Sequence, residues 1–320
     1  MLGEFDLIAK YFTKETCDKT VSLAVGDDCA LLEAQNDSYL AITTDTLNEG
    51  IHYFKGEDPF LIGYKSLLVN VSDLASMGAK PQYFTLSITL KSVDESFLKG
   101  FSDGLFSLSN KLNMTLIGGN TSKGDSDSFT IEALGYVKKD RAMLRSNAKI
   151  GDLIFVTGTL GAPALYVDSG YNKIKLDSAK SLKAHNLSML MQDRCDFAYD
   201  LSSICNCAID ISDGLVGDIQ HILDRSHVGA QIDVERLPIS RIIYEANVSK
   251  DYAYNLALFG GGDYELLFTI DKGAVKDLHA LALKHGLCVT CIGEITDSGI
   301  LSLKENNKDF KSSNKAFEHF

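Results

Sequence analysis

Five short acidic motifs are spread along the whole chain, and each sets an aspartate beside glycine, serine or threonine. Each motif lies at or near the end of an apolar run, so folding can bring several carboxylates into one cleft. Clustered carboxylates repel each other unless cations lie between them. Mg²⁺ prefers such oxygen ligands, usually together with substrate phosphates. The sequence therefore predicts a site that holds metal and phosphate together. The motifs are Gly26-Asp27-Asp28, Thr43-Thr44-Asp45-Thr46, Asn70-Val71-Ser72-Asp73, Asp210-Ile211-Ser212-Asp213-Gly214 and Gly260-Gly261-Gly262-Asp263.

Most of these motifs also have a purely structural interpretation. Gly and Asp dominate tight turns, so a solvated hairpin turn explains Asp27 and Asp28. An aspartate after a strand is a natural helix cap, which explains Asp45. An exposed helical aspartate such as Asp73 usually faces only solvent. The motif around Asp210 is the most specific, because a helix cap does not account for an aspartate inside an apolar run.

Two glycine-rich segments indicate close approach of the backbone to a neighbour. Leu116-Ile117-Gly118-Gly119-Asn120-Thr121 is a strand that runs into a glycine pair, where bare N–H groups can approach a phosphate. Three glycines precede Asp263, and such freedom indicates close approach by a ligand or by other backbone. The chain has neither a GxxxxGK[ST] loop nor a GxGxxG fingerprint, so any ATP site is of another kind.

Composition narrows the class of protein further. The 320 residues carry 45% hydrophobic and 23% charged side chains, as expected for about two globular domains. The formal net charge of −12 argues against binding to nucleic acid or to an anionic membrane surface. A nucleotide could bind such an acidic protein only with cations between them.

Cysteines and apolar runs indicate a reducing cytoplasm. The seven cysteines are irregularly spaced and form no disulfide framework. Cys288 and Cys291 have the spacing of a zinc knuckle but lack a second ligand pair, so buried free thiols are expected instead. The N-terminal segment has no basic region with a long apolar core, and no apolar run approaches the roughly 20 residues of a membrane span.

The first half reads as alternating strands and helices. Residues 39–47 and 83–90 alternate as strands, and a helix between them has Asp58 as its cap and Pro59 in its first turn. A second helix starts near Asp94, and strands follow at 115–120 and 129–137. This order predicts an α/β half with a mixed or antiparallel sheet.

The second half also combines strands with helices. Polar residues 138–152 form the junction, and strands are expected at 152–158, 208–211, 264–270 and 287–295. Helical sequence occurs at 178–200, after Gly214 and at 274–285. We therefore expect an α/β (α+β) protein with a first domain at 1–138 and a second at 139–320.

The order and wording of the motifs resemble one known family. GDDCALL, TTDTLNEGIHYF, NVSDLASMGAKP, LIGGNTSKG, RSNAKIGD, AIDISDGL and GGGDYELLFT are similar to the motifs of thiamine-monophosphate kinases. These kinases belong to the superfamily that includes aminoimidazole ribonucleotide synthetase. The resemblance covers nearly the whole chain. It implies ATP-dependent phosphorylation of thiamine phosphate to thiamine diphosphate, with several Mg²⁺ ions and no side-chain nucleophile.

The resemblance also implies an architecture and a set of site residues. The expected fold has an N-terminal domain that binds metal and ATP and whose mixed sheet forms a homodimer interface, followed by a C-terminal α/β domain. The implied ATP contacts are Gly119, Asn120, Arg145 and Ser212, and the implied substrate contacts are His52, Gly262 and Phe317. The implied metal ligands are Asp28, Thr43, Thr44, Asp45, Asp73, Asn120, Asp210 and Asp213.

Two positions depart from the family pattern. Asn120 stands where the family has an aspartate, and Gly262 stands where the pattern GGED has a carboxylate. These changes bear on the number of metals and on substrate affinity more than on the reaction. Two alternatives stay open: a related ATP-using cyclase with a different acceptor, and a nucleotide-binding scaffold without activity.

Overall fold

The computed structural model describes residues 21–23, 27–28, 30–33 and 37–312. The first half forms a six-stranded sheet in the order β1-β2-β3-β6-β4-β5. Only the β4–β5 pair is parallel, so the sheet is mixed, as the sequence predicted. The strands are β1 (Val21–Leu23), β2 (Ala30–Glu33), β3 (Ser38–Asn48), β4 (Lys80–Leu90), β5 (Thr115–Lys123) and β6 (Ser128–Lys138).

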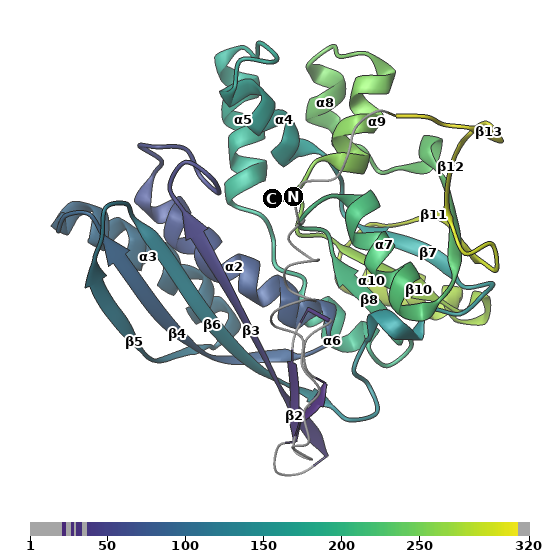
Figure 1. Ribbon diagram of the computed structural model, residues 1–320, viewed down its shortest axis with the longest axis horizontal. Coiled ribbons are helices and arrows are strands. Elements are labelled where there is room, and N and C mark those ends of the chain that lie inside the picture. The colour runs from purple at the N-terminus through teal and green to yellow at the C-terminus, as the bar shows by residue number, and fades with distance from the viewer. Residues whose placement is uncertain (1–20, 24–26, 29, 34–36, 313–320) are drawn as a thin grey trace, which may run out of the picture.

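Two long helices, α2 (Pro59–Ser76) and α3 (Glu95–Leu112), cover one face of this sheet (Figure 1). Their starts are the predicted ones, since Asp58 and Asp94 accept hydrogen bonds from the first backbone N–H groups of α2 and α3. The helices cross at very short range. A Cβ on Gly104 would lie 1.9 Å from the Phe60 carbonyl oxygen, so only glycine allows this crossing.

The second half forms a seven-stranded sheet in the order β13-β12-β9-β11-β7-β10-β8. Its strands are β7 (Leu153–Thr157), β8 (Cys207–Asp210), β9 (Gly229–Asp233), β10 (Leu266–Ile270), β11 (Val289–Thr296), β12 (Leu301–Glu305) and β13 (Lys308–Asp309). Its helices are α4 (Ala162–Gly170), α5 (Ser178–Met189), α6 (Cys195–Leu201), α7 (Leu215–Ser226), α8 (Arg241–Glu245), α9 (Lys250–Phe259) and α10 (Val275–Lys284). All pairs are antiparallel except β9–β12.

Helix α2 links the two halves. On one side it packs on β3 and β6, and on the other it contacts α6 and β8 of the second half (Figure 1). Fourteen of its 18 residues are buried, including Lys65, Asn70 and Ser72. Polar side chains on such a helix are held between two layers, where each needs a partner. Several of the predicted site residues lie on this helix or beside it.

The sequence located most of these elements and missed several short ones. Strand β9, helices α8 and α9 and the final hairpin β12–β13 were not expected. Their apolar periods are too short to separate from loops. The cysteine prediction was partly wrong: Cys195, Cys205 and Cys207 are buried and unpaired, but Cys288 is exposed. Within the described ranges, no helix is long and apolar enough to span a membrane.

Candidate metal and phosphate site

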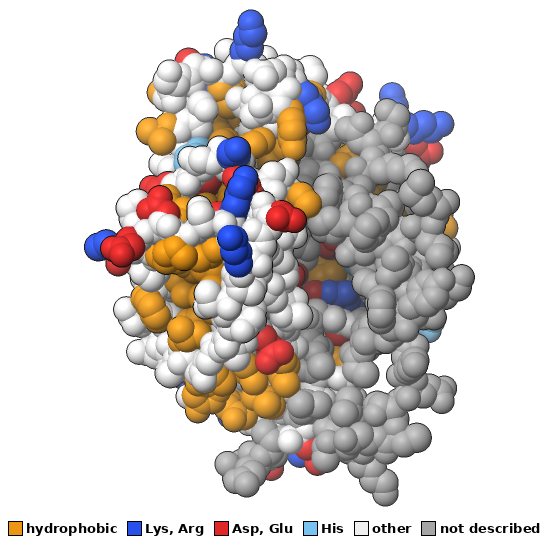
Figure 2. Space-filling model, turned by 60° about the vertical axis from the view of Figure 1, so that its left-hand side comes forward, with side chains coloured by type: hydrophobic (Ala, Val, Ile, Leu, Met, Phe, Trp, Pro, Cys, Tyr) orange, Lys and Arg blue, Asp and Glu red, His pale blue; other side chains and the backbone are white. Residues whose placement is uncertain are grey.

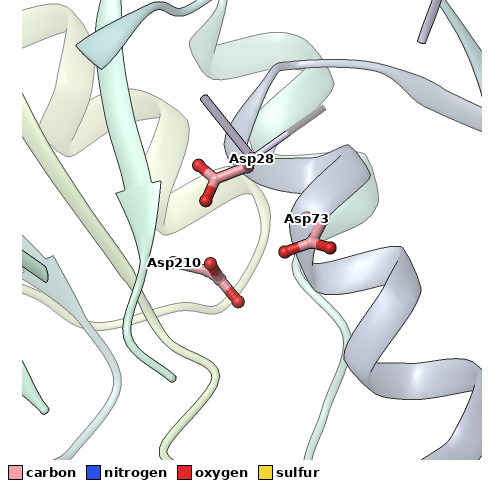
Figure 3. Close-up of side chains that lie close together, drawn as sticks. All are labelled: Asp28, Asp73 and Asp210. Atoms are coloured by element: carbon pink, nitrogen blue, oxygen red, sulfur yellow. The ribbon is translucent and has the colours of Figure 1, made fainter. Parts of the chain in front are cut away.

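Three carboxylates from distant parts of the chain converge between the two halves (Figure 3). Asp28 comes from the β1–β2 connection, Asp73 from α2 and Asp210 from the end of β8. One ligand oxygen of each lies within 4.8 Å of the others. The Asp210 residue is 2% exposed. The structure thus brings together three of the predicted metal ligands.

Hydroxyl groups hold each of these carboxylates in place. Each donor lies on α2 or on the facing strand β3. The bonds are Thr43 Oγ1 to Asp73 Oδ2 at 2.5 Å, Ser72 Oγ to Asp210 Oδ2 at 2.7 Å and Ser76 Oγ to Asp28 Oδ2 at 2.7 Å. The sequence analysis missed Ser72 and Ser76 as orienting residues. Their four-residue spacing, which places both on one face of a helix, was the available signal.

Asp45 lies beside this cluster. Its backbone N–H donates to Asn70 Oδ1 at 3.0 Å, so Asn70 fixes the strand rather than presenting its oxygen to a ligand. Burial, reinforced by the charges of Asp210 and Asp213, raises the pKa of Asp45 to about 6. Burial, Asp45 and Asp210 likewise raise the pKa of Asp73. Four carboxylates therefore repel one another here, and a cation would relieve that repulsion.

Arg145 supplies the positive charge at one edge of the cluster. Its guanidinium pairs with Asp28 and lies 3.3 Å from Asp27 Oδ1. The side chains of Asp27 and Asp28 are only 2% and 4% exposed, so the solvated-turn interpretation of this motif is wrong. Burial raises the pKa of Asp27 to about 6, although the nearby Arg145 opposes the shift. Arg145, the predicted nucleotide contact, thus also fixes Asp27 and Asp28 in the connection between β1 and β2.

The AIDISDGL segment gives strand β8, a turn and helix α7. Neither Ser212 nor Asp213 caps this helix, because Gly214 is the cap residue and makes no side-chain cap bond. Instead Asp218, one turn into α7, accepts from the N–H groups of Asp213 and Gly214 at 3.3 and 3.1 Å. The Asp213 carboxylate is therefore not needed as a cap. It is close enough to raise the pKa of Asp45.

The three glycines allow backbone to lie directly on this turn. The N–H of Gly262 donates to the Ser212 carbonyl at 2.7 Å, and a Cβ on Gly261 would lie 2.5 Å from the same oxygen. Gly262 has a φ of 88°, which favours glycine. The Asp263 carboxylate accepts from the Gly161 N–H at 2.8 Å and ties the loop to α4. The predicted close approach is thus between two stretches of backbone.

The Thr44 side chain and two predicted residues of β5 lie away from the cluster. The Thr44 hydroxyl donates to the Ile131 carbonyl, and the residue is exposed on the face of the sheet opposite Thr43. Gly119 and Asn120 lie on edge strand β5, three strand spacings or about 14 Å from β3. Within one chain, Gly119 and Asn120 do not meet the carboxylates.

The remaining predicted substrate contacts lie in different places. His52 lines a small pocket beyond the end of β3, where its Nδ1 accepts from the Asn48 N–H at 3.0 Å. Gly262 lies in the loop over Ser212. Phe317 falls outside the described residues.

The donor set of the cluster fits a hard divalent cation. Its oxygens come from aspartates, it contains no thiolate or imidazole, and its members repel one another unless a cation binds.

Two family models match the chain: AIR synthase related protein, N-terminal domain, at residues 26–137, and AIR synthase related protein, C-terminal domain, at 149–305. The fold and the carboxylate site thus define an AIR synthase related protein.

Full-length relatives narrow this class. The chain is 43% identical to the thiamine-monophosphate kinase of Buchnera aphidicola subsp. Acyrthosiphon pisum, covering 99% of this chain and 98% of that one. It is 42% identical to the thiamine-monophosphate kinase of Escherichia coli K12, with the same coverage. The chain belongs to the thiamine-monophosphate kinase family, and it is therefore an enzyme of the phosphotransferase class.

Solved structures agree with this membership. The chain matches a structure described as AaThiL complexed with AMPPCP and TMP, with a TM-score of 0.84, 30% identity and coverage of 99% and 97% of the two chains. It matches the thiamine-monophosphate kinase from Stenotrophomonas maltophilia K279a with a TM-score of 0.80, 35% identity and coverage of 91% and 93%. Escherichia coli HypE, at 17% identity and a TM-score of 0.68, shares the fold alone.

The raised pKa of Asp45 predicts that ionisation of this side chain lowers the free energy of unfolding of the metal-free protein. Between about pH 4 and 6 the folded state keeps a proton that the unfolded state has lost, so the free energy of unfolding falls as pH rises. Asp45→Asn removes this ionisation. With EDTA present, the variant should gain on the order of 3 kcal/mol over the parent at pH 7.5 and much less at pH 4.5.

Urea unfolding at both pH values measures this difference, and exposed Asp125→Asn is the matched control. An equal gain in the free energy of unfolding at the two pH values would show that the charge on Asp45 does not destabilise the folded protein.

Proposed function

We propose that this enzyme uses ATP to phosphorylate thiamine phosphate to thiamine diphosphate, the last step of thiamine diphosphate biosynthesis. The observation that supports this most directly is the convergence of Asp28, Asp73 and Asp210. It occurs in a chain that matches a structure with AMPPCP, an ATP analogue, and TMP bound. Phosphoryl transfer requires positioned groups and neutralised charge more than covalent chemistry, which fits a site made of carboxylates.

We propose direct in-line transfer, with a phosphate oxygen of the substrate as the nucleophile. No side chain is then needed as a nucleophile. When bound, Mg²⁺ would neutralise the charge that builds on the phosphates. Thr43, Ser72 and Ser76 fix the carboxylates that would hold it. The proposed ligands are Asp28, Thr43, Thr44, Asp45, Asp73, Asn120, Asp210 and Asp213, with Thr44 contributing its backbone oxygen.

The nucleotide is proposed to contact Gly119, Asn120, Arg145 and Ser212. Arg145 lies at the carboxylate cluster and carries a positive charge that a phosphate could share with Asp28. The substrate is proposed to contact His52, Gly262 and Phe317. His52 accepts a backbone N–H at Nδ1, so its neutral ring carries the proton on Nε2.

We further propose a homodimer built on the first sheet. All nine residues of β5 are exposed, and Leu116 and Ile117 are 37% and 54% exposed on this unpaired edge. Figure 2 shows apolar side chains gathered on the side of the molecule that β5 occupies. Since Asn120 is too far from β3 in its own chain, β5 of one copy would complete the nucleotide site of the other. The domain division at 138/139 separates this dimerisation domain from the C-terminal domain.

A direct assay tests the proposed reaction. The protein, incubated with ATP, Mg²⁺ and thiamine phosphate, should form thiamine diphosphate and ADP in equal amounts. ADP formed only with another acceptor would support the cyclase alternative. Tight binding of Mg²⁺–ATP in calorimetry, without turnover of a thiamine compound, would support an inactive scaffold.

Asp213→Asn should lower kcat by about a hundredfold or more. Loss of one carboxylate leaves the phosphates poorly neutralised in the transition state, and charge stabilisation of this kind is commonly worth a few kcal/mol. The fold should be little affected, because the capping bonds are made by Asp218. Steady-state kinetics at saturating Mg²⁺ measures the effect, with exposed Asp224→Asn on the same helix as control. Normal turnover would remove Asp213 from the site.

Asn120→Asp should lower the Mg²⁺ concentration needed for half-maximal rate. A neutral amide attracts a cation less strongly than a carboxylate does, so the native chain should need unusually high Mg²⁺. Activity is titrated against Mg²⁺ for both proteins at fixed ATP. Superimposable curves would show that position 120 does not bind metal.

Ile117→Asp should convert the proposed dimer into monomers of 34.9 kDa and abolish most activity. A charge in the centre of an apolar interface is strongly unfavourable because it is desolvated without a partner. Light scattering measures the mass, and exposed Val93→Asp is the control for an added charge. A fully active monomer would contradict the shared site.

A further inference from the structure

A second polar feature lies beyond the carboxylate cluster, in the small pocket that His52 lines. The pocket, of about 40 Å³, is formed between the two halves of the molecule. Residues 50–54 and Lys65 come from the first half, and Tyr166, Tyr171 and Met189 come from the second. It admits only the edge of a ligand, since one water needs roughly 10–15 Å³ by this measure.

Aromatic rings form the walls of this pocket. Phe54 packs edge-on against Tyr166 and Tyr171, with ring centroids 5.5 and 5.6 Å apart. The Tyr166 hydroxyl donates to Glu57 at 3.1 Å, and Glu57 also pairs with His185 at 2.8 Å. These bonds hold the walls in a fixed geometry. A flat aromatic ring is the shape that such walls accommodate best.

The floor of the pocket contains a buried cation. Lys65 is 7% exposed, and its Nζ has two weak contacts, to the His52 carbonyl at 3.4 Å and to Met189 Sδ at 4.0 Å. In the described part of the chain, no carboxylate forms an ion pair with it within 4.0 Å. Burial lowers the pKa of Lys65 to about 8, against the opposing effect of Glu57. Such a poorly solvated ammonium group is costly unless a ligand also binds it.

The pocket lies at a definite distance from the carboxylates. Along β3, Asn48 lies three positions after Asp45, a distance of about 10 Å. The N–H of Asn48 binds His52 in the pocket. Along α2, eight residues separate Lys65 from Asp73, which corresponds to about 12 Å. Both elements therefore place the pocket one small molecule away from the proposed phosphate site.

We propose that Lys65 is a specificity-determining residue that donates a hydrogen bond to a ring nitrogen at the non-phosphorylated end of the substrate. The substrate class is a phosphate ester whose far end is a flat heteroaromatic ring with a hydrogen-bond acceptor on its edge. In thiamine phosphate this end is the aminopyrimidine. This inference rests on the proposed function, and it adds the group that distinguishes a two-ring substrate from its phosphorylated half.

Lys65→Met tests the proposal, because methionine keeps the length of the side chain and packs beside Met189. The variant should fold at least as well as the parent, since a buried charge is removed. Its KM for thiamine phosphate should rise at least tenfold, as expected for the loss of a hydrogen bond to a charged group. Its Kd for a non-hydrolysable Mg²⁺–ATP analogue, measured by calorimetry, should stay unchanged.

A shorter substrate makes the test specific. The phosphate of the hydroxyethylthiazole half lacks the pyrimidine, so it cannot reach Lys65. The parent should prefer thiamine phosphate over this compound in kcat/KM, and Lys65→Met should reduce that preference by at least tenfold. Exposed Lys55→Met, in the loop that precedes α2, is the matched control and should leave the preference unchanged.

The outcomes separate this inference from the proposed function. If the parent forms no thiamine diphosphate, the proposed function fails whatever Lys65 does. If the parent is active and Lys65→Met lowers kcat/KM equally for both substrates, or changes neither, Lys65 does not bind the ring and the inference is overturned. A selective loss with thiamine phosphate supports it.

Discussion

Repulsion among aspartates that lie between two domains is the constraint on which this structure depends. Asp28, Asp45, Asp73 and Asp210 come from four separate segments, and burial raises the pKa values of the last three, with neighbouring aspartates adding to the shift at Asp45 and Asp73. A fold that keeps them together must fix each one by hydrogen bonds and leave room for a cation. Helix α2 does most of this, because it carries Asp73 and supplies the hydroxyl groups of Ser72 and Ser76.

The same repulsion requires tight packing of the elements around the site. Gly63 and Gly104 let α2 and α3 pack backbone to backbone, and the loop at Gly261 lies directly on Ser212. Close-packed backbone of this kind has few alternative arrangements. Asp73 and Asp210 are thus held on a helix and a strand rather than on loops, as pre-organised charge stabilisation requires.

Much of the fold and part of the site could be predicted from the sequence. Asp58 and Asp94 located two helix starts, and the aspartate in an apolar run, Asp210, indicated a buried carboxylate. The distance of Asn120 from β3 could not be predicted, because strand order depends on pairing between residues far apart in sequence. The capping role of Asp218 was also missed, since a side chain that reaches back from inside a helix has no signature of its own.

Helix α2 has a consequence for how sequences of this kind can change in length. Lys65 and Asp73 lie on one unbroken helix, so an inserted residue between them would rotate Asp73 by about 100° and shift it by about 1.5 Å. A deletion would do the same in the opposite sense. Length changes between these residues should therefore be absent among active relatives, whereas the exposed turn at residues 297–300 can gain or lose residues freely.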